Sequence, residues 1–261
     1  MAAPPKPATR IDLNADVGEG FGVYPMGSDA ELLALVTSAN VACGFHAGDP
    51  TVMDRTVGEA VRLGVALGAH PGYPDLRGFG RRPLDADPDE VERDVLYQIG
   101  ALQAFARAHG AALIHVKPHG ALYNQAAVDQ RLARAVARAV ARAGGELILV
   151  GLAGSSALSD AAAAAGLRFA AEAFADRAYE RDGTLASRKL PGSSITDPRA
   201  AAAQALRIAR ERTVVARDGT EVPVVAETLC LHGDNPNALA NARAVREALE
   251  AAGIALRALA A

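Results

Sequence analysis

Residues 10–20, RIDLNADVGEG, decide the fold class of this 261-residue chain. A short apolar run ends there in glycines, as a buried strand does where it passes into a loop, and we predict a strand over residues 10–17. Asn14, Asp16 and Glu19 stand where the apolar run finishes. Because ligands of parallel α/β folds bind at the carboxyl ends of the strands, these three side chains are the first candidates for a polar site.

Six further segments repeat this pattern, and a helical stretch of Ala, Leu and Val follows nearly every one. The other predicted strands cover residues 38–45, 65–69, 111–116, 147–151, 167–174 and 222–231. The predicted helices cover residues 29–36, 51–63, 88–109, 129–143, 155–165, 198–212 and 236–252. The alternation predicts an α/β fold, an irregular (β/α)7 TIM-like barrel, although eight strands or an open doubly wound sheet would give much the same pattern.

We expect residues 10–261 to form a single barrel domain, since barrels of this length commonly form one unit. Residues 1–9, MAAPPKPAT, have two adjacent prolines and lack the apolar segment of a signal peptide, so we expect a disordered tail. Residues 175–196 show no periodicity and contain Gly, Ser, Arg and Pro. A loop of that length in a compact domain is usually functional, often a lid.

Composition narrows the set of partners. The formal net charge is -3, and Arg is mixed evenly with Asp and Glu, so there is no basic stripe to neutralise a phosphate backbone, and we expect no nucleic-acid partner. No apolar run approaches the roughly 18 to 20 residues that span a bilayer, so we expect no membrane partner. Cys43 and Cys230 make no disulfide framework, which indicates free thiols in a cytoplasmic protein.

Ionisable side chains recur at the predicted strand ends, next to Gly or Pro. Converging so many charges costs stability unless a metal, a substrate or paired charges offset it, and we therefore predict a polar site at this end of the fold. A single histidine in such a place would more often be a loop or cap residue. The candidates beyond the first strand are His46, His70, Lys117, His119, Glu172, His232 and Asp234, with Arg188 in the long loop.

These segments resemble the LamB/YcsF family. The matching motifs are DLNADVGEGFG (12–22), SANVACGFHAGDP (38–50), GAHPGYPD (68–75), GFGRR (78–82), HVKPHGALYN (115–124), FADRAYERDGTLASR (174–188) and LHGDNP (231–236). The resemblance runs in unchanged order over about 240 residues; Ala15 stands where the family pattern leads us to expect Cys, which argues against essential thiol chemistry there. It implies ATP-dependent hydrolysis of 5-oxoproline to glutamate with partner subunits B and C, on a barrel similar to those of glycoside hydrolases and deacetylases.

The residue types suggest roles in such a reaction. We predict that Lys117 and Arg188 neutralise a phosphate or the substrate carboxylate, and that Asp16 or Glu172 acts as general base. The alternative is that Lys117 and Arg188 merely pair with nearby carboxylates. We assign Asp16, Lys117, His119 and Glu172 to catalysis, and Asn14, Glu19, His46, His70, Arg188, His232 and Asp234 to substrate or phosphate binding.

Two kinds of cofactor follow. ATP would bring Mg²⁺, but the chain has no G-x-x-x-x-G-K-[ST] loop, so an ATP site would be of another kind or shared with the partners. Asp16, His46, His70, His119 and His232 are candidates for a Zn²⁺ or Mn²⁺ site, with Asp16, His46 and His70 as the first choice and neutral hydrogen-bonding histidines as the alternative. Rival functions are a stand-alone metal-dependent amide hydrolase or deacetylase and, third, a non-catalytic role in a complex. Arg81 and Arg82 form either a wall for an anion or a surface ion pair.

Overall fold

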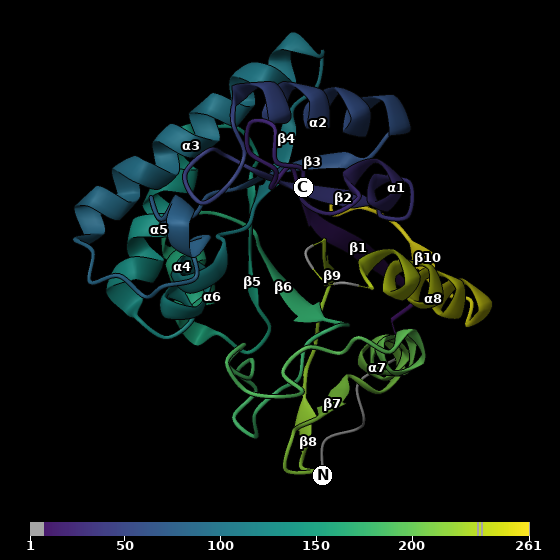
Figure 1. The fold of residues 1–261 in the computed structure, drawn as a ribbon. Coiled ribbons are helices and arrows are strands. Elements are labelled where there is room, and N and C mark those ends of the chain that lie inside the picture. The colour runs from purple at the N-terminus through teal and green to yellow at the C-terminus, as the bar shows by residue number, and fades with distance from the viewer. Residues whose placement is uncertain (1–7, 234, 236, 261) are drawn as a thin grey trace.

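The computed structural model describes residues 8–233, 235 and 237–260. Its centre is a sheet of seven parallel strands in which β1 pairs with both β2 and β9, so the sheet closes into a barrel (Figure 1). This confirms the seven-stranded TIM-like barrel and decides against an open sheet. The barrel strands are β1 (Arg10–Val17), β2 (Ser38–Ala42), β3 (Ala66–His70), β4 (Leu113–Val116), β5 (Ile148–Leu152), β6 (Phe169–Phe174) and β9 (Thr228–His232).

The helices lie around the outside of this barrel (Figure 1). Most begin at a residue whose side chain accepts a backbone N–H of the first turn, and Asp49, Asp129, Ser155 and Asp197 all cap helices in this way. The helices are α1 (Asp29–Leu33), α2 (Pro50–Leu63), α3 (Pro88–Ala108), α4 (Gly120–Ala126), α5 (Gln130–Ala143), α6 (Ser156–Ala164), α7 (Pro198–Glu211) and α8 (Ala238–Ala251), with a 3-10 turn, η1 (Leu76–Gly78).

The prediction of one strand over residues 222–231 is wrong. The structure divides that run between β8 (Glu221–Pro223), which pairs with β7 (Thr213–Val215) in an antiparallel hairpin, and the barrel strand β9. Val222 and Val224 are both buried, so the hairpin and the barrel strand form one apolar stretch in the sequence. Helix α4 and the short strand β10 (Ala255–Leu256), which pairs with the start of β1, were not predicted.

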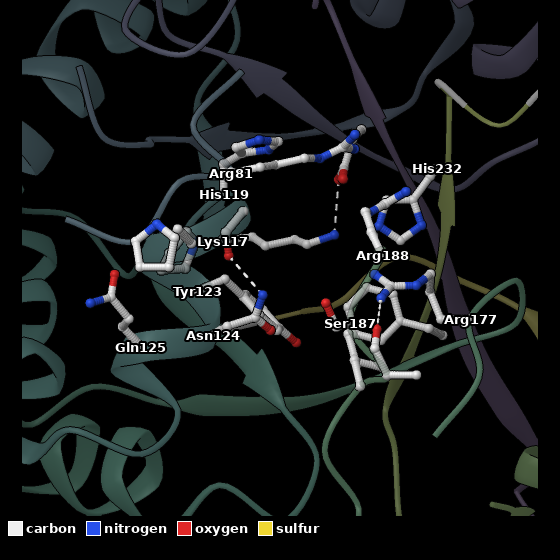
Figure 2. A pocket seen from close by; sticks show the side chains of 18 of the residues that line it. Arg81, Lys117, His119, Tyr123, Asn124, Gln125, Arg177, Ser187, Arg188 and His232 are labelled. Carbon is white, nitrogen blue, oxygen red and sulfur yellow. Dashed lines mark hydrogen bonds and ion pairs between the residues drawn. The ribbon is translucent and has the colours of Figure 1, made fainter. Parts of the chain in front are cut away.

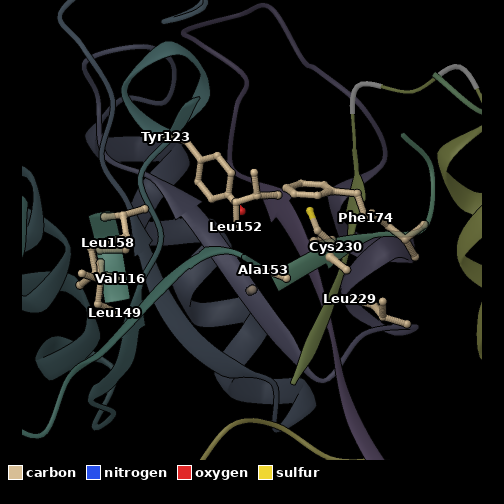
Figure 3. Packing of buried hydrophobic residues seen from close by; sticks show 14 of the residues in the cluster. Val116, Tyr123, Leu149, Leu152, Ala153, Leu158, Phe174, Leu229 and Cys230 are labelled. Carbon is tan, nitrogen blue, oxygen red and sulfur yellow. The ribbon is translucent and has the colours of Figure 1, made fainter. Parts of the chain in front are cut away.

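The core is built from Ala, Val, Leu and Ile, as the scarcity of aromatic residues predicts. Figure 3 shows part of this packing, with Leu149 and Leu158 on one side and Phe174 beside the Cys230 sulfur on the other. Both Cys43 and Cys230 are buried and free, which confirms the expectation of unpaired thiols.

Residues 1–7 of the predicted tail lie outside the described residues, while the backbone N–H of Ala8 donates to the Ala209 carbonyl at 2.8 Å. The loop 175–196 has neither helix nor strand and is held by isolated bridges, Arg177 with Ser194 and Tyr179 with Leu185. Within the described part of the chain, no helix has the length and apolar character needed to cross a membrane.

Candidate active site

A cavity of about 470 Å³ opens at the carboxyl ends of the barrel strands. Figure 2 shows Lys117 extended across it, between the side that carries His119 and the side that carries His232. The strand ends, α4 and the loop 175–196 all contribute to its wall. The predicted site residues that line it are Asp16, His70, Lys117, His119, Arg188 and His232.

Four buried side chains form what we call the lysine centre: Asp16, Lys117, Glu172 and Cys230. The Lys117 ammonium donates to Asp16 Oδ1 at 2.9 Å and to Cys230 Sγ at 2.9 Å, and it lies 3.0 Å from Glu172 Oε1. Burial alone would raise the pKa of Asp16, but its neighbours His70 and Lys117 hold it well below its usual range. Burial would likewise lower the pKa of Lys117, yet Asp16 raises it well above its usual range. The Asp16–Lys117 pair is therefore ionised.

A hydrogen-bond network continues from the lysine centre into the barrel. Asn40 donates to Asp16 at 2.9 Å and to Asn14 at 2.6 Å, and Asn14 donates to Glu172 at 3.0 Å. His115 Nε2 bonds the Asn40 oxygen at 2.7 Å. Burial, followed by the charge of Lys117, lowers the pKa of His115 to about 3. These buried residues orient the carboxylates of Asp16 and Glu172 from the interior of the barrel.

Glu19, His46, His70 and His119 make a second group, which we call the histidine cluster. His46 and His119 stack in parallel with ring centroids 3.7 Å apart, and Glu19 Oε1 lies 3.3 Å from His46 Nε2 and 3.5 Å from His119 Nδ1. His119 Nδ1 is 2.9 Å from His70 Nε2. All four side chains are buried. His70 Nε2 also lies 3.4 Å from Asp16 Oδ2, where the cluster meets the lysine centre.

Glycines make room for these imidazoles. A Cβ on Gly72 would come within 2.8 Å of His46 Nδ1, and one on Gly80 would come within 2.7 Å of His46 Cβ and 2.9 Å of His119 Cδ2. Gly80 also has a φ of +62°, which side chains rarely adopt. The loop after β3 can therefore close over the cluster only because these two positions are glycine.

His232 stands on the opposite side of the cavity, paired with Asp176. Its Nδ1 lies 2.9 Å from Asp176 Oδ1, and its backbone N–H donates to the same carboxylate at 3.1 Å. Burial alone would raise the pKa of Asp176, but His232 lowers it. Because Nδ1 donates to a carboxylate, Nε2 is the nitrogen of the neutral ring that can accept a proton.

Cationic side chains gather around the cavity. Arg81, Arg177, Arg188 and Lys189 line the cavity. Arg177 donates to the backbone carbonyls of Ala186 and Ser193 at 2.6 and 3.1 Å, and burial followed by the charge of Arg188 lowers its pKa to about 10. The cations are thus close enough to disfavour one another, which is the electrostatic condition of an anion site.

Comparison with known proteins identifies the family of this chain and several of its relatives. The sequence profile of the LamB/YcsF family matches residues 11–261. The chain belongs to the LamB/YcsF family. It is 57% identical over 249 residues to a protein from Heliobacterium modesticaldum that is named as the A subunit of 5-oxoprolinase, covering 95% of this chain and 98% of the relative.

Solved structures agree with this membership. The lactam utilization protein from Thermus thermophilus is 55% identical, with a TM-score of 0.90 over 96% of this chain and 100% of that one. A T48 deacetylase is 14% identical, with a TM-score of 0.50 over 95% of this chain and 87% of that one, which shows a likeness of fold alone. The LamB/YcsF barrel thus has the predicted similarity to deacetylase barrels.

The LamB/YcsF site brings most of the predicted residues together, but in more than one layer. Asn14, Glu19, His46 and Glu172 do not line the cavity; they lie behind the residues that do, and their roles remain predictions. Asp234 lies outside the described residues. Of the two predicted roles of the GFGRR arginines, Arg82 has that of an ion pair, with Asp75. Arg81 stacks over the Phe79 ring at 4.7 Å and lines the cavity.

Sequence reasoning on the LamB/YcsF chain missed Tyr123, which lies on the unpredicted helix α4 and lines the cavity. It counted Asp176, two residues after β6, among the ionisable groups at the strand ends, but it gave this residue no role, and it left Cys230 out of the site. Nothing in the sequence pairs Cys230 with Lys117, since the contact joins strands 113 residues apart.

Two groups of side chains in this LamB/YcsF site could hold a metal ion. One is the histidine cluster, and the other is Asp16 with Cys230 and His232; within each, the ligand atoms lie within 4.8 Å of one another. The predicted set of Asp16, His46 and His70 is therefore divided between the two groups. Three imidazoles and a carboxylate are donors that Zn²⁺ and Mn²⁺ accept, so the cluster fits such an ion.

Proposed function

We propose that this chain hydrolyses the lactam of 5-oxoproline to glutamate in an ATP-dependent reaction, together with subunits of the B and C type. The observation that carries the proposal is the cavity, in which four cationic side chains surround a buried ion pair. Its volume of about 470 Å³ is within the range of small-molecule sites. The names of the relatives, the A subunit of 5-oxoprolinase and a lactam utilization protein, point to the same substrate class.

The cations suit an anionic substrate. 5-Oxoproline carries a carboxylate, and ATP-dependent activation would add a phosphoryl group to the lactam oxygen. An anion bound near Arg177 and Arg188 would relieve the mutual repulsion that lowers the pKa of Arg177. We assign binding of these groups to Arg81, Arg177 and Arg188, and we move Lys117 from substrate binding to the orientation of Asp16 and Glu172.

A lactam is a stable amide, and its opening needs an activated carbonyl or a coupled energy source. Transfer of the terminal phosphoryl group of ATP to the lactam oxygen supplies that energy, and water then adds to the ring carbon. The carbon–nitrogen bond breaks, the nitrogen takes up protons to become the amino group, and a second water releases phosphate. Since the chain lacks a P-loop, we place the ATP and Mg²⁺ site wholly or partly on the partner subunits.

His232 is the best placed general base. Asp16 is engaged by Lys117 in an ionised pair, which makes it a poor proton acceptor, whereas Asp176 holds His232 with one nitrogen left to face the cavity. Water bound beside that nitrogen would lose its proton to His232, which could later protonate the leaving nitrogen. This revises the sequence-based assignment of the base to Asp16 or Glu172.

The second candidate function is a stand-alone metal-dependent amide hydrolase. The histidine cluster favours it, because a metal held there would polarise a carbonyl or lower the pKa of bound water without ATP. The two candidates differ in whether ATP and partner subunits are needed.

The deciding experiment measures glutamate release from 5-oxoproline with this chain alone and with B and C subunits, each with and without ATP. We expect product only in the complete mixture with ATP. Hydrolysis of this or another amide by the chain alone without ATP would replace the proposal with the metal hydrolase.

The role of His232 is tested in the same assay by His232→Gln. We expect kcat to fall by about 10²- to 10⁴-fold, as for loss of a general base, with an unchanged melting temperature. The control is His109→Gln, because His109 pairs with Asp54 on the outer surface of the molecule. Equal loss in both variants, or none in His232→Gln, would remove His232 from the mechanism.

A further inference from the structure

We propose that the histidine cluster, Glu19 with His46, His70 and His119, is a binding site for one first-row transition-metal ion of the Zn²⁺ type. The inference concerns binding and does not depend on which substrate the enzyme uses. It rests on where the imidazole protons lie, which the backbone carbonyls around the cluster determine.

Two of the histidines have their tautomers fixed by carbonyl oxygens, which can only accept hydrogen bonds. His70 Nδ1 lies 2.7 Å from the carbonyl of Lys117, so Nδ1 carries the proton. His119 Nε2 lies 2.9 Å from the carbonyl of Phe79, so Nε2 carries the proton. The other two nitrogens, His70 Nε2 and His119 Nδ1, therefore bear lone pairs in the neutral rings, and they face each other at 2.9 Å.

Two facing lone pairs need a positive particle between or beside them. One solution is an extra proton, which would make an imidazolium in a fully buried group of three imidazoles. Such a charge would have to be carried by buried rings, with Asp16 Oδ2 at 3.4 Å from His70 Nε2 to balance it. The other solution is a metal ion bound by the lone pairs, which needs neutral imidazoles.

The spacing of the ligand atoms suits the second solution. Zn–N and Zn–O bonds of about 2.0–2.1 Å in a tetrahedron place neighbouring ligand atoms roughly 3.3 Å apart. The observed separations are 3.3 Å between His46 Nε2 and Glu19 Oε1, 3.5 Å between His119 Nδ1 and Glu19 Oε1, and 2.9 Å between His119 Nδ1 and His70 Nε2. Seating an ion also requires the ring of His46 or His119 to turn, because a metal–nitrogen bond lies in the imidazole plane and these two planes are parallel.

The surroundings also match a ligand site. Metal-bound histidines usually donate their second nitrogen to a carbonyl or carboxylate, and Lys117 and Phe79 provide such acceptors for two of the three rings. His46 Nδ1 has no hydrogen-bond partner among the described residues, which leaves this ring free to present its Nε2 lone pair toward Glu19. A set of imidazoles plus one carboxylate selects Zn²⁺ or Mn²⁺ over Ca²⁺ and Mg²⁺, which prefer oxygen.

The other group, Asp16 with Cys230 and His232, is a weaker competitor. Asp16 and Cys230 both accept the Lys117 ammonium at 2.9 Å, and His232 is directed by Asp176. A cation there would have to displace a buried ammonium from its carboxylate, at a cost that the histidine cluster does not impose.

Metal binding is measured on the full chain after chelator treatment, by adding Zn²⁺, desalting and counting bound metal by mass spectrometry. We expect close to one equivalent. Less than one tenth of an equivalent would overturn the proposal and leave the shared proton as the solution.

Cobalt(II) spectra of the same wild-type protein identify the site without any substitution. Nitrogen and oxygen ligands give visible d–d bands alone, whereas the Cys230 group would add a thiolate charge-transfer band in the near ultraviolet. The proposal expects no such band, and its appearance would assign the ion to the Cys230 group instead.

Matched variants complete the test. Glu19→Gln and His119→Gln should each weaken Zn²⁺ binding by at least about 100-fold, since even the loss of a residue that only orients a ligand costs 10- to 100-fold. His232→Gln and the surface variant His109→Gln should bind as the wild type does. Retained binding in Glu19→Gln, which preserves shape and removes charge, would overturn the assignment even if His119→Gln did not fold.

Discussion

The lysine centre and the histidine cluster lie side by side at the same end of the barrel, and they solve the problem of buried polar groups differently. In the lysine centre, one ammonium stands between two carboxylates, and each opposite charge is 2.9 to 3.0 Å away. In the histidine cluster, two nitrogens that carry lone pairs when both rings are neutral face each other. The first group holds a fixed cation, although one of its two carboxylates has no matching charge within the group, whereas the second group is made of three imidazoles and one carboxylate.

We infer from this difference that the lysine centre serves the stability of the fold, and that the histidine cluster serves to bind a ligand. Lys117 takes part in both, because its side chain pairs with Asp16 while its carbonyl orients His70. A substitution in the lysine centre should therefore mainly lower the free energy of unfolding, whereas a substitution in the histidine cluster should mainly weaken metal binding.

The largest expected effect is on the lysine centre. Lys117→Met keeps the apolar stem of the side chain but leaves Asp16 and Glu172 buried without their cation, so we expect a loss of about 3–5 kcal/mol in the free energy of unfolding. Urea denaturation monitored by circular dichroism measures it. The control is Lys189→Met, which removes an exposed cation from the same cavity and should change stability by less than about 0.5 kcal/mol.

A double variant tests whether the lost stability comes from the unpaired carboxylates. Adding Glu172→Gln to Lys117→Met removes one of the two stranded carboxylates, and part of the lost stability should return. If Lys117→Met unfolds at the same urea concentration as the wild type, the centre does not depend on its ammonium, and the contrast between the two groups fails.

A smaller effect concerns His115, which links the lysine centre to the barrel interior through Asn40. Burial and the Lys117 charge lower its pKa to about 3, against about 6.5 in the unfolded chain. Below pH 6.5 the imidazole of His115 is protonated in the unfolded chain but not in the folded chain. Its contribution to the free energy of unfolding therefore falls as the pH drops from about 6.5 to about 3. The slope approaches about 1.4 kcal/mol per pH unit.

His115→Gln keeps a donor for Asn40 and cannot take up that proton. Unfolding free energies at pH 7, 6 and 5 should therefore fall less steeply in the variant, with about 2 kcal/mol of difference in the change between pH 7 and pH 5. Parallel curves would mean that the folded ring titrates normally and that the polar interior is wetter than the structure indicates.

The fold and the edge that carries the site could be predicted from the sequence, because both follow from local pattern. Apolar runs that end in Gly and polar residues predict parallel strands, whose carboxyl ends lie together at one end of the barrel. Asp16, His70, Lys117 and His119 do line one cavity at that end. Helix α4 escaped because its seven residues are too short to show periodicity. The strand over residues 222–231 failed because a hairpin and a barrel strand are equally apolar.

The partners within the site could not be predicted, because they depend on distances between strands far apart in the chain. The sequence left open whether Lys117 meets substrate or carboxylates, and the structure pairs it with Asp16, Glu172 and Cys230. It placed Asp16 first among the candidate ligands with the histidines, whereas the ligand atoms place Glu19, and not Asp16, with His46, His70 and His119. Proton positions on imidazoles likewise depend on carbonyls supplied by other segments.

The smallest expected effect tests whether the lysine centre is complete. The Tyr123 hydroxyl is buried and lines the cavity, yet neither it nor Glu172 Oε2 has a hydrogen-bond partner among the described residues. Burial, followed by the charge of Glu172 and the approach of the hydroxyl to that carboxylate, raises the pKa of Tyr123 well above its usual range, so the hydroxyl keeps its proton and has either a bound substrate or Glu172 as a possible acceptor. The T-shaped contact of its ring with Phe174, at 5.8 Å between centroids, does not need the hydroxyl.

Tyr123→Phe therefore separates a ligand contact from a structural one. Since an unsatisfied buried hydroxyl costs free energy, its removal should leave stability unchanged or raise it by up to about 1 kcal/mol, while kcat/KM for 5-oxoproline in the complete assay falls about 10-fold through the lost hydrogen bond. Steady-state kinetics and urea denaturation of the same preparation measure both. Lower stability with unchanged kinetics would show that the hydroxyl serves Glu172 in the folded chain. In that case Tyr123 would be a fifth member of the lysine centre.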